Sequence, residues 1–259
     1  MLSDAQAMDV AARAVDAVSD ALGKLDDWGP SGLRDGQYRC DLAADTAAIE
    51  VLRGAGIAVL SEESGRHGGS SQLTAVVDPV DGSTNAASGI PYYACSVAVV
   101  DREGPWVAVV ANLATGARYR AVRGKGATLD GSALSPSRTG SVESALIGFN
   151  GWPSRHMGWR QYRVLGAAAL ELCAVAQGAL DGYVDVTSDG LAPWDYMGAL
   201  LICQEAGALV VEAEGRELWN VPADERRSVV AAGTPQLLED LLAKRRAAAR
   251  TVRVGGEGA

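Results

Sequence analysis

The sequence predicts an α/β protein in which helices and sheets are stacked in layers. Two observations indicate this class. Segments with helical periodicity alternate with short apolar segments typical of strands in both halves of the chain. A chain of 259 residues with 48% apolar residues can also bury a large core without disulfide crosslinks. The composition shifts to Ser, Pro, Thr and Gly over residues 135–144, which indicates two subdomains, 1–138 and 139–259.

The N-terminal half is expected to begin with two helices. Ser3 and Gln6 have the spacing of a capping box, and apolar residues then recur at helical spacing as far as Leu25. The first helix should end near Trp28-Gly29-Pro30. The second helix is predicted over residues 41–52, and its pattern is stopped by glycines at 54 and 56.

Five strands are expected to follow in this half. The segment 66–72 is polar and glycine-rich and is expected to be a flexible link. Short turns join the last strands, so we predict a large, mainly antiparallel sheet. The predicted strands are residues 57–60, 73–77, 92–100, 106–113 and 117–122.

The C-terminal half alternates strands with helices. Thr234 and Pro235 should open the last helix, and the chain is expected to fray after Thr251. The predicted strands are residues 145–149, 183–186, 209–212 and 228–232, and the helices before the last one are 165–180 and 195–206.

Composition and charge exclude several classes of function. With 32 acidic and 23 basic residues the net charge is −9, and such a surface repels nucleic acid. No apolar run approaches the roughly 20 residues that cross a bilayer, and no signal peptide is visible. We therefore expect a cytoplasmic protein without membrane partners. Its four cysteines should be buried free thiols, because they are widely spaced among apolar neighbours: Cys40, Cys95, Cys173 and Cys203.

Histidine is too scarce for several kinds of active site. Only His67 and His156 are present, so a three-histidine zinc site is impossible. The sequence also lacks the GxSxG turn of many serine hydrolases. Any catalysis is therefore expected to depend on carboxylates.

The segment DPVDGSTN, residues 78–85, is the most informative one. Asp78 ends an apolar strand, and Asp81 follows at a spacing that lets two carboxylates share or bridge metal ions. The backbone N–H groups that follow could bind a phosphate if a helix begins there. The spacing excludes an EF-hand, a DxD phosphatase and a P-loop. A plain Asp-Gly turn remains the alternative at this stage.

Other acidic residues stand at the predicted ends of elements. These are Glu62 and Glu63 after a strand, Asp195 at the start of a helix, and Asp41 at the start of another. The alternatives are a solvated loop for the Glu pair and helix-capping roles for the two Asp residues. Carboxylates that converge in one cleft would form an oxygen-only ligand set, which suits Mg²⁺, Mn²⁺ or Ca²⁺.

Together these segments resemble the inositol monophosphatase superfamily of Mg²⁺-dependent, lithium-sensitive phosphatases. SEESG is similar to the family's GEES element, and AVVDPVDGSTNAASGIPYYACSVAV to its WVIDPIDGTTNF element and the next strand. RVLGAAALELCAVAQGALDGYVD and PWDYMGALLICQEAGA resemble its two C-terminal signatures. The resemblance spans roughly residues 35–233. It implies the alternating αβαβα sandwich of the inositol monophosphatase and fructose-1,6-bisphosphatase type, with the active site at the seam between the subdomains.

The resemblance also implies which residues bind metal. Glu62, Asp78 and the backbone carbonyl of Val80 would hold one Mg²⁺. Asp78, Asp81 and Asp195 would hold a second, and Mn²⁺ could substitute. Glu62 and Glu63 lie where the family binds a third, weaker ion.

Catalytic and substrate-binding roles carry over in the same way. Ser83 would help to activate the attacking water, with Asp41 as its carboxylate partner and Glu62 as the third catalytic residue. The amides of Gly82 and Ser83 and the turn Gly166-Ala167-Ala168 would hold the phosphate, and Asp185 would bind hydroxyl groups of the alcohol. The loop 150–162 is a candidate for substrate specificity or a surface loop with a packed tryptophan.

The implied function is hydrolysis of inositol monophosphate or a similar polyol or sugar phosphate. Fructose 1,6-bisphosphate and histidinol phosphate remain alternative substrates, because enzymes that act on them share the same motifs. A non-catalytic regulatory binding protein is the alternative from another class. Homodimers are common among relatives, so a homodimer is expected here.

Overall fold

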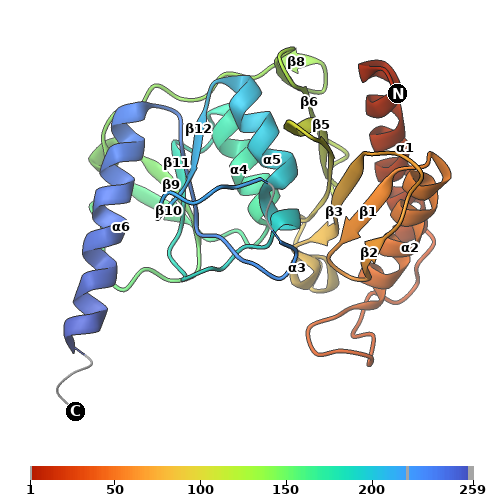
Figure 1. The fold of residues 1–259 in the computed structure, drawn as a ribbon. Coiled ribbons are helices and arrows are strands. Elements are labelled where there is room, and N and C mark those ends of the chain that lie inside the picture. Colours follow the sequence, from red (N-terminus) through yellow and green to blue (C-terminus); the bar gives the residue numbers. More distant parts are fainter. Residues whose placement is uncertain (1, 220–221, 256–259) are drawn as a thin grey trace.

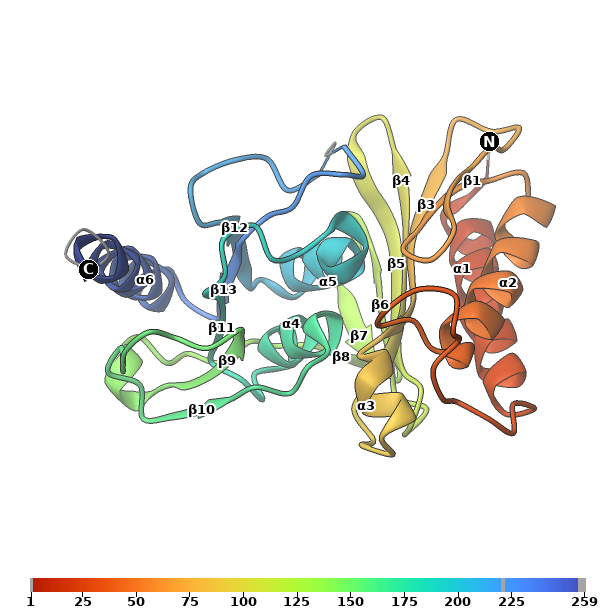
Figure 2. The same ribbon diagram turned by 90° about the horizontal axis from the view of Figure 1, so that it is seen from below.

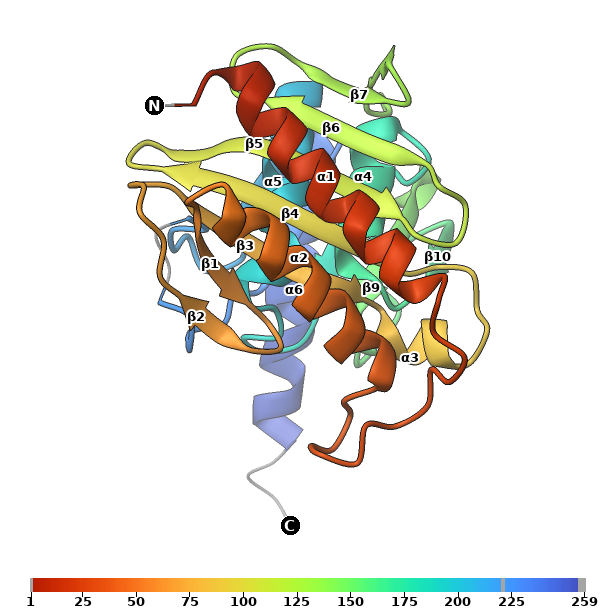
Figure 3. The ribbon, with the colours of Figure 1, turned by 90° about the vertical axis from the view of Figure 1, so that its right-hand side faces the viewer.

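The computed structural model describes residues 2–219 and 222–255 and stacks helices and sheets in five alternating layers (Figure 1). Helices α1 (Asp4–Leu22) and α2 (Arg39–Gly54) cover the outer face of the first sheet (Figure 3). Helices α4 (Ala168–Gln177) and α5 (Pro193–Ala206) lie between the two sheets, and α6 (Pro235–Gly255) packs on the far side of the second (Figure 2). The predicted αβαβα sandwich is confirmed.

The first sheet has eight strands in the order β2-β1-β3-β4-β5-β6-β7-β8. Strands β1 and β3 are parallel, and the other neighbours are antiparallel. The strands are β1 (Ala58–Ser61), β2 (Gly65–His67), β3 (Thr74–Asp81), β4 (Ala94–Asp101), β5 (Gly104–Asn112), β6 (Arg118–Val122), β7 (Ala127–Leu129) and β8 (Ser132–Ala133).

The second sheet has five strands in the order β10-β9-β11-β13-β12, with β9 parallel to both β10 and β11. They are β9 (Leu146–Asn150), β10 (Gln161–Arg163), β11 (Gly182–Asp185), β12 (Leu209–Glu212) and β13 (Val229–Ala232). The two sheets lie on either side of residue 138, and the division into subdomains there stays a prediction. A short 3₁₀ turn, Val142–Ser144, precedes β9.

Two of the predicted helices were too long. Helix α1 ends at Leu22 rather than near Trp28, because Gly23, a poor helix former, caps it. Helix α4 spans Ala168–Gln177 instead of residues 165–180. Gly166 and Gly178 have positive φ values of 78° and 81°, so the chain leaves the helical conformation at both ends.

Helix α2 begins at Arg39, two residues earlier than predicted, and Asp41 lies in its first turn. Helix α5 likewise begins at Pro193, so Asp195 is its third residue. In both helices the Asp carboxylate accepts the backbone N–H three residues earlier, as in a capping box. Helix α6 continues past Thr251, where fraying was predicted, to Gly255, and the last four residues lie outside the described ones.

Strand β3 corrects the prediction for the central motif. The strand does not end at Asp78 but continues to Asp81, and the register with β4 shifts between these two residues. This β-bulge puts three residue steps on β3 against two on β4, from Ser96 to Ala94. The bulge lets Pro79, which has no N–H to donate, remain in a strand.

Part of the segment expected to be flexible is also a strand. Gly65–His67 forms β2 at the sheet edge and pairs with β1. Strands β7, β8 and β10 were not predicted either. Each has only two or three residues, which is too short to show the alternation of apolar and polar residues that is typical of a strand. In the loop 150–162, Trp159 is buried and its ring centroid lies 5.0 Å from that of Phe149, whereas Trp152 is exposed.

The four cysteines are buried and unpaired, as predicted. Within the part of the chain that the structure describes, every helix is too short or too polar to span a membrane.

Candidate active site

A cavity of about 210 Å³ opens between the two sheets. Its wall is formed where β1, β3 and β9 end and where α3 (Ser83–Ala87), α4 and α5 begin. The lining residues are Glu62, Asp78, Val80, Asp81, Gly82, Ser83, Asn150, Gly166, Ala167, Ala168, Glu171, Tyr183, Leu191 and Asp195. Segments up to 133 residues apart in the sequence, from Glu62 to Asp195, thus meet in one site.

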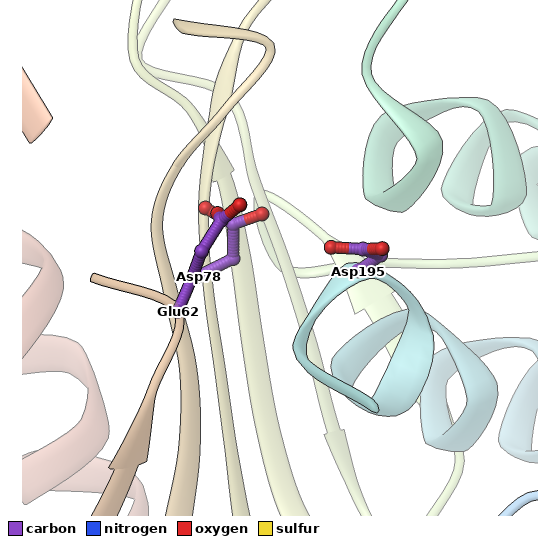
Figure 4. A group of neighbouring side chains, drawn as sticks. All are labelled: Glu62, Asp78 and Asp195. Atoms are coloured by element: carbon purple, nitrogen blue, oxygen red, sulfur yellow. The ribbon is translucent and has the colours of Figure 1, made fainter. Parts of the chain in front are cut away.

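Three carboxylates form a compact group in this cavity. Ligand oxygens of Glu62, Asp78 and Asp195 all lie within 4.8 Å of one another. Glu62, directly after β1, and Asp78, within the neighbouring parallel strand β3, stand side by side, and Asp195 faces them from the first turn of α5 (Figure 4). The backbone N–H of Val80 holds Asp78 Oδ1 at 3.0 Å, and the N–H of Ala192 holds Asp195 Oδ2 at 2.7 Å.

Burial and mutual repulsion make these acids hard to ionise. Burial raises the pKa of Glu62 and of Asp195 to about 7 and that of Asp81 to about 8, and the neighbouring carboxylates add to the shift. The pKa of Asp78 is also raised well above its usual value, for the same two reasons. Among the described residues that line the cavity there is no lysine, arginine or histidine. A set of oxygen donors with excess negative charge fits a hard divalent cation.

Asp81 lies in the cavity but is not one of this group of three. Its two carboxylate oxygens accept the backbone N–H groups of Ala168 and Ala169, at 3.2 and 2.7 Å. The first turn of α4, with its partial positive charge, therefore receives a carboxylate from the other sheet.

Glu63 points to a different partner. Its Oε2 accepts hydrogen bonds from Arg34 Nη2 at 2.8 Å and from Gln37 Nε2 at 2.5 Å. Glu63 is not among the residues that line the cavity. A cation bound through Glu63 would have to compete with the Arg34 guanidinium.

Ser83 and Asp41 are in contact, as the resemblance implies. The Ser83 hydroxyl is a polar neighbour that lowers the pKa of the Asp41 carboxyl, and this carboxylate accepts the Tyr38 N–H at 2.8 Å. Asp41 is 3% exposed, and its burial raises its pKa to about 6. The N-cap of α3 is Gly82, so Ser83 is the first residue of the helix and does not act as its cap.

Two turns that carry backbone N–H groups touch each other. A Cβ on Gly82, whose φ is +85°, would lie 2.8 Å from the Gly166 carbonyl oxygen. Asn85 joins the turns, since its Nδ2 donates to the Leu165 carbonyl at 2.7 Å and to the Tyr92 carbonyl at 2.8 Å. All five residues predicted to hold phosphate line the cavity: Gly82, Ser83, Gly166, Ala167 and Ala168.

Glu171 was missed by the sequence analysis. This α4 residue is 2% exposed, and its Oε1 accepts the Leu165 N–H at 3.4 Å. Burial raises the pKa of its carboxyl to about 7, and the nearby N–H groups of Leu165, Gly166 and Ala167 lower it in part. A phosphate at this turn would have to replace the Glu171 carboxylate, whereas the Gly82-Ser83 turn lies directly beside Asp78 and Asp81 in the chain. The signal in the sequence was a lone acidic residue in an otherwise apolar helix.

Asp185, the residue predicted to bind hydroxyl groups of the alcohol, is the last residue of β11. Asp185 is fully buried and is not among the residues that line the cavity. Asn150, Tyr183 and Leu191 line it instead. Asn150 was noted only as the first residue of a candidate loop.

Raised carboxyl pKa values predict how stability depends on pH. In EDTA, we expect the melting temperature to fall as the pH rises from about 5 to about 8.5. The unfolded carboxyl groups ionise near pH 4. In the folded protein these acids keep their protons up to about pH 7–8, because their pKa values are raised. Tighter proton binding by the folded state stabilises it against unfolding. This contribution is complete below about pH 4 and is lost as the pH rises through the folded pKa values.

Thermal unfolding with and without excess Mg²⁺ tests this prediction. Mg²⁺ should raise the melting temperature more at the higher pH, because a cation binds the ionised carboxylates. A melting temperature that stays constant or rises with pH in EDTA would contradict it.

Comparison with known proteins identifies the family. The family model described as "Inositol monophosphatase family" matches residues 5–250. A fructose-1,6-bisphosphatase/inositol-1-monophosphatase of Methanothermobacter thermautotrophicus is 36% identical over 78% of this chain and 80% of its own. The Nus factor SuhB of Salmonella typhimurium is 30% identical over 83% and 84%.

A solved structure shows the same fold. A Pyrococcus horikoshii protein, described as similar to inositol-1 monophosphatase, superposes with a TM-score of 0.78 and 30% identity over 92% of this chain and 96% of its own. These matches confirm the resemblance seen in the sequence and agree with the carboxylate group in the cavity. The chain therefore belongs to the inositol monophosphatase family of metal-dependent phosphatases.

Proposed function

We propose that the protein hydrolyses the phosphate monoester of a small polyol, with inositol monophosphate as the reference substrate and Mg²⁺ as cofactor. The observation that carries this proposal is the composition of the cavity. One part of its lining offers carboxylates and backbone N–H groups, and another offers neutral polar and apolar side chains. No cationic side chain is among the described residues that line the cavity.

The carboxylates would hold two Mg²⁺ ions, with Mn²⁺ as a substitute. Glu62, Asp78 and the carbonyl of Val80 would bind one, and Asp78, Asp81 and Asp195 the other. A third, weaker ion at Glu62 and Glu63 would have to displace Arg34 from Glu63. Bound divalent ions would neutralise the phosphate and lower the pKa of the attacking water.

The remaining steps fall to residues of the chain. The Gly82 and Ser83 amides would bind phosphate oxygens. The Ser83 hydroxyl would accept a hydrogen bond from the attacking water and pass the proton to Asp41, whose pKa of about 6 suits a base at neutral pH. The low exposure of Asp41 would keep solvent from this pair.

The absence of cations among the described lining residues favours a monophosphate. A second phosphate, as in fructose 1,6-bisphosphate, is frequently bound by arginine or lysine side chains. A polyol instead needs neutral hydrogen-bonding groups, and the partly exposed Asn150 offers one. We therefore expect inositol 1-phosphate to be preferred over fructose 1,6-bisphosphate.

A substrate panel tests the proposal. Inositol 1-phosphate, fructose 1,6-bisphosphate, histidinol phosphate and adenosine 3′,5′-bisphosphate would each be incubated with Mg²⁺, with Mn²⁺, with Mg²⁺ plus Li⁺, and in EDTA after metal removal. The highest kcat/KM is expected for inositol 1-phosphate with Mg²⁺, with inhibition by Li⁺. Full activity in EDTA would exclude the metal mechanism, and a higher kcat/KM for a bisphosphate would exclude the proposed substrate class.

The regulatory alternative has less support, since every carboxylate expected for catalysis is present. The homodimer, the cytoplasmic location and the lack of nucleic-acid and membrane partners stay predictions.

A further inference from the structure

We infer that Asn150 selects the alcohol part of the substrate, and that Asp185 and Arg245 are positioning residues that fix the Asn150 amide. This inference rests on the proposed phosphatase function and names the side chain that would recognise the polyol. It replaces the sequence-based expectation that Asp185 itself contacts the hydroxyl groups.

Asn150 is placed where a ligand can reach it. It is the last residue of β9, pairs with Asp185 at the end of β11, and lines the cavity together with Tyr183 and Leu191. It is partly exposed, in contrast to the fully buried Asp185. Of this neighbouring pair, Asn150 lines the cavity and Asp185 does not.

The Asp185 carboxylate sets the orientation of the amide. Asp185 Oδ1 accepts hydrogen bonds from Asn150 Nδ2 at 3.2 Å and from the Thr187 N–H and hydroxyl at 2.9 and 2.6 Å. Only the NH₂ end of an asparagine can donate to a carboxylate. The Asn150 carbonyl oxygen therefore remains as the acceptor for a hydroxyl group of the ligand.

Arg245 of α6 fixes the backbone beneath this pair. It is 8% exposed, and its Nε and Nη2 donate to the carbonyl oxygens of Asp185 and Thr187 at 2.7 and 3.1 Å. Its Nη1 contacts Glu214 at 3.2 Å. The guanidinium thus spans the end of β11 and the loop that follows, which a lysine with its single ammonium group cannot do with the same geometry.

The loop also closes over the Asp185 carboxylate. A Cβ on Gly190 would lie 1.9 Å from Thr187 Oγ1 and 2.7 Å from Asp185 Oδ2. Oδ2 is buried and has no hydrogen-bond partner among the described residues. The same Cβ would lie 3.0 Å from Asn150 Nδ2, so the loop packs over both the Asp185 carboxylate and the NH₂ end of the Asn150 amide.

The test compares two substrates that differ in hydroxyl groups. Inositol 1-phosphate offers hydroxyls to Asn150, and p-nitrophenyl phosphate offers none. In the Asn150→Ala variant we expect the ratio of kcat/KM for inositol 1-phosphate to that for p-nitrophenyl phosphate to fall about tenfold, mainly through KM, the size expected for one lost hydrogen bond. Gln161→Ala removes an exposed amide from the adjacent strand β10 and is the control, with no expected change in the ratio.

The positioning roles require two further variants. Asp185→Asn should lower the same ratio in the parent protein but not in the Asn150→Ala background, because it acts through Asn150. Arg245→Lys should lower the ratio more than it lowers turnover of p-nitrophenyl phosphate.

Three results would overturn the inference. An unchanged ratio in Asn150→Ala would do so, as would an equal loss with both substrates, which indicates a structural role. A further loss caused by Asp185→Asn in the Asn150→Ala background would show that Asp185 contacts the substrate itself. A parent protein that hydrolyses p-nitrophenyl phosphate but not the polyol ester would instead refute the proposed substrate, and inactivity on both would refute the proposed phosphatase mechanism as well.

Discussion

Replacing Asp195 with asparagine should lower phosphatase turnover by more than about 100-fold while the protein remains folded. Loss of an outer hydrogen-bonding partner alone costs 10- to 100-fold in many metal sites, and Asp195 would bind the metal directly. Asp195 is also the member of the group that faces Glu62 and Asp78 from α5 (Figure 4). Without Asp195, this group would offer a metal ion no carboxylate from the second half of the chain, and only Glu62 and Asp78 would remain.

The fold should survive because asparagine can still cap the helix. Asp195 Oδ2 accepts the Ala192 N–H, and the carbonyl oxygen of an asparagine can do the same. In EDTA the variant is expected to melt at a higher temperature than the parent, since one of several repelling carboxylates is gone. The measurements are kcat at saturating Mg²⁺, Mg²⁺ affinity by calorimetry, and thermal unfolding in EDTA.

Asp9→Asn makes the same chemical change at an exposed position on α1 and should leave all three quantities as they are. Near-normal turnover of Asp195→Asn at saturating Mg²⁺ would remove Asp195 from the proposed ligand set.

The second large effect is expected at Ser83. Ser83→Ala should lower kcat by about 10²- to 10⁴-fold, the usual contribution of a positioned general base. KM should change little, because the Ser83 backbone amide remains. Asp41→Asn should cause a similar loss, and the double variant should be little worse than either single one, since hydroxyl and carboxylate act as one unit.

Thermal unfolding separates this role from a structural one. Asp41 also accepts the Tyr38 N–H at the start of α2, so Asp41→Asn tests catalysis and capping together. Ser83→Ala affects only the hydroxyl, and Ser88→Ala at the other end of α3 is its control. If Ser83→Ala kept normal turnover, the proton relay through Asp41 would have to be abandoned.

Much of the fold could be predicted from the hydrophobic pattern and the motifs of the sequence. Long apolar segments predicted the central strands and the helices that cover them, and the DPVDG motif pointed to the segment at the end of β3 that carries Asp78 and Asp81. The ends of elements were less predictable. Strand β3 continues through Pro79, which has no N–H to donate, because the pairing with β4 contains a bulge at this point. The bulge depends on the partner strand and is not visible in the β3 sequence itself.

In the candidate site, too, some features could be predicted from the sequence and others depend on distant contacts. Glu62, Asp78 and Asp195 stand at ends of apolar segments, so their convergence could be expected from the sequence. The sequence could not predict whether Asp185 or Asn150 lines the cavity. This depends on Arg245, which lies 60 residues after Asp185 in the chain, and on the close packing of Gly190. Glu171 was hidden for a similar reason, as its partners are N–H groups of a turn that only exists once α4 starts at Ala168.

The contact between Gly82 and Gly166 has a consequence for how such a protein can evolve. A side chain at Gly82 would collide with the other turn, so the wall that we propose to bind the phosphate tolerates little variation. The opposing residues, Asn150 and Leu191, stand at the borders of loops, where a side chain can be exchanged while backbone hydrogen bonds such as those between Leu191 and Arg227 are kept. Mutation can therefore explore new alcohols on one side of the cavity while the chemistry on the other side is inherited intact.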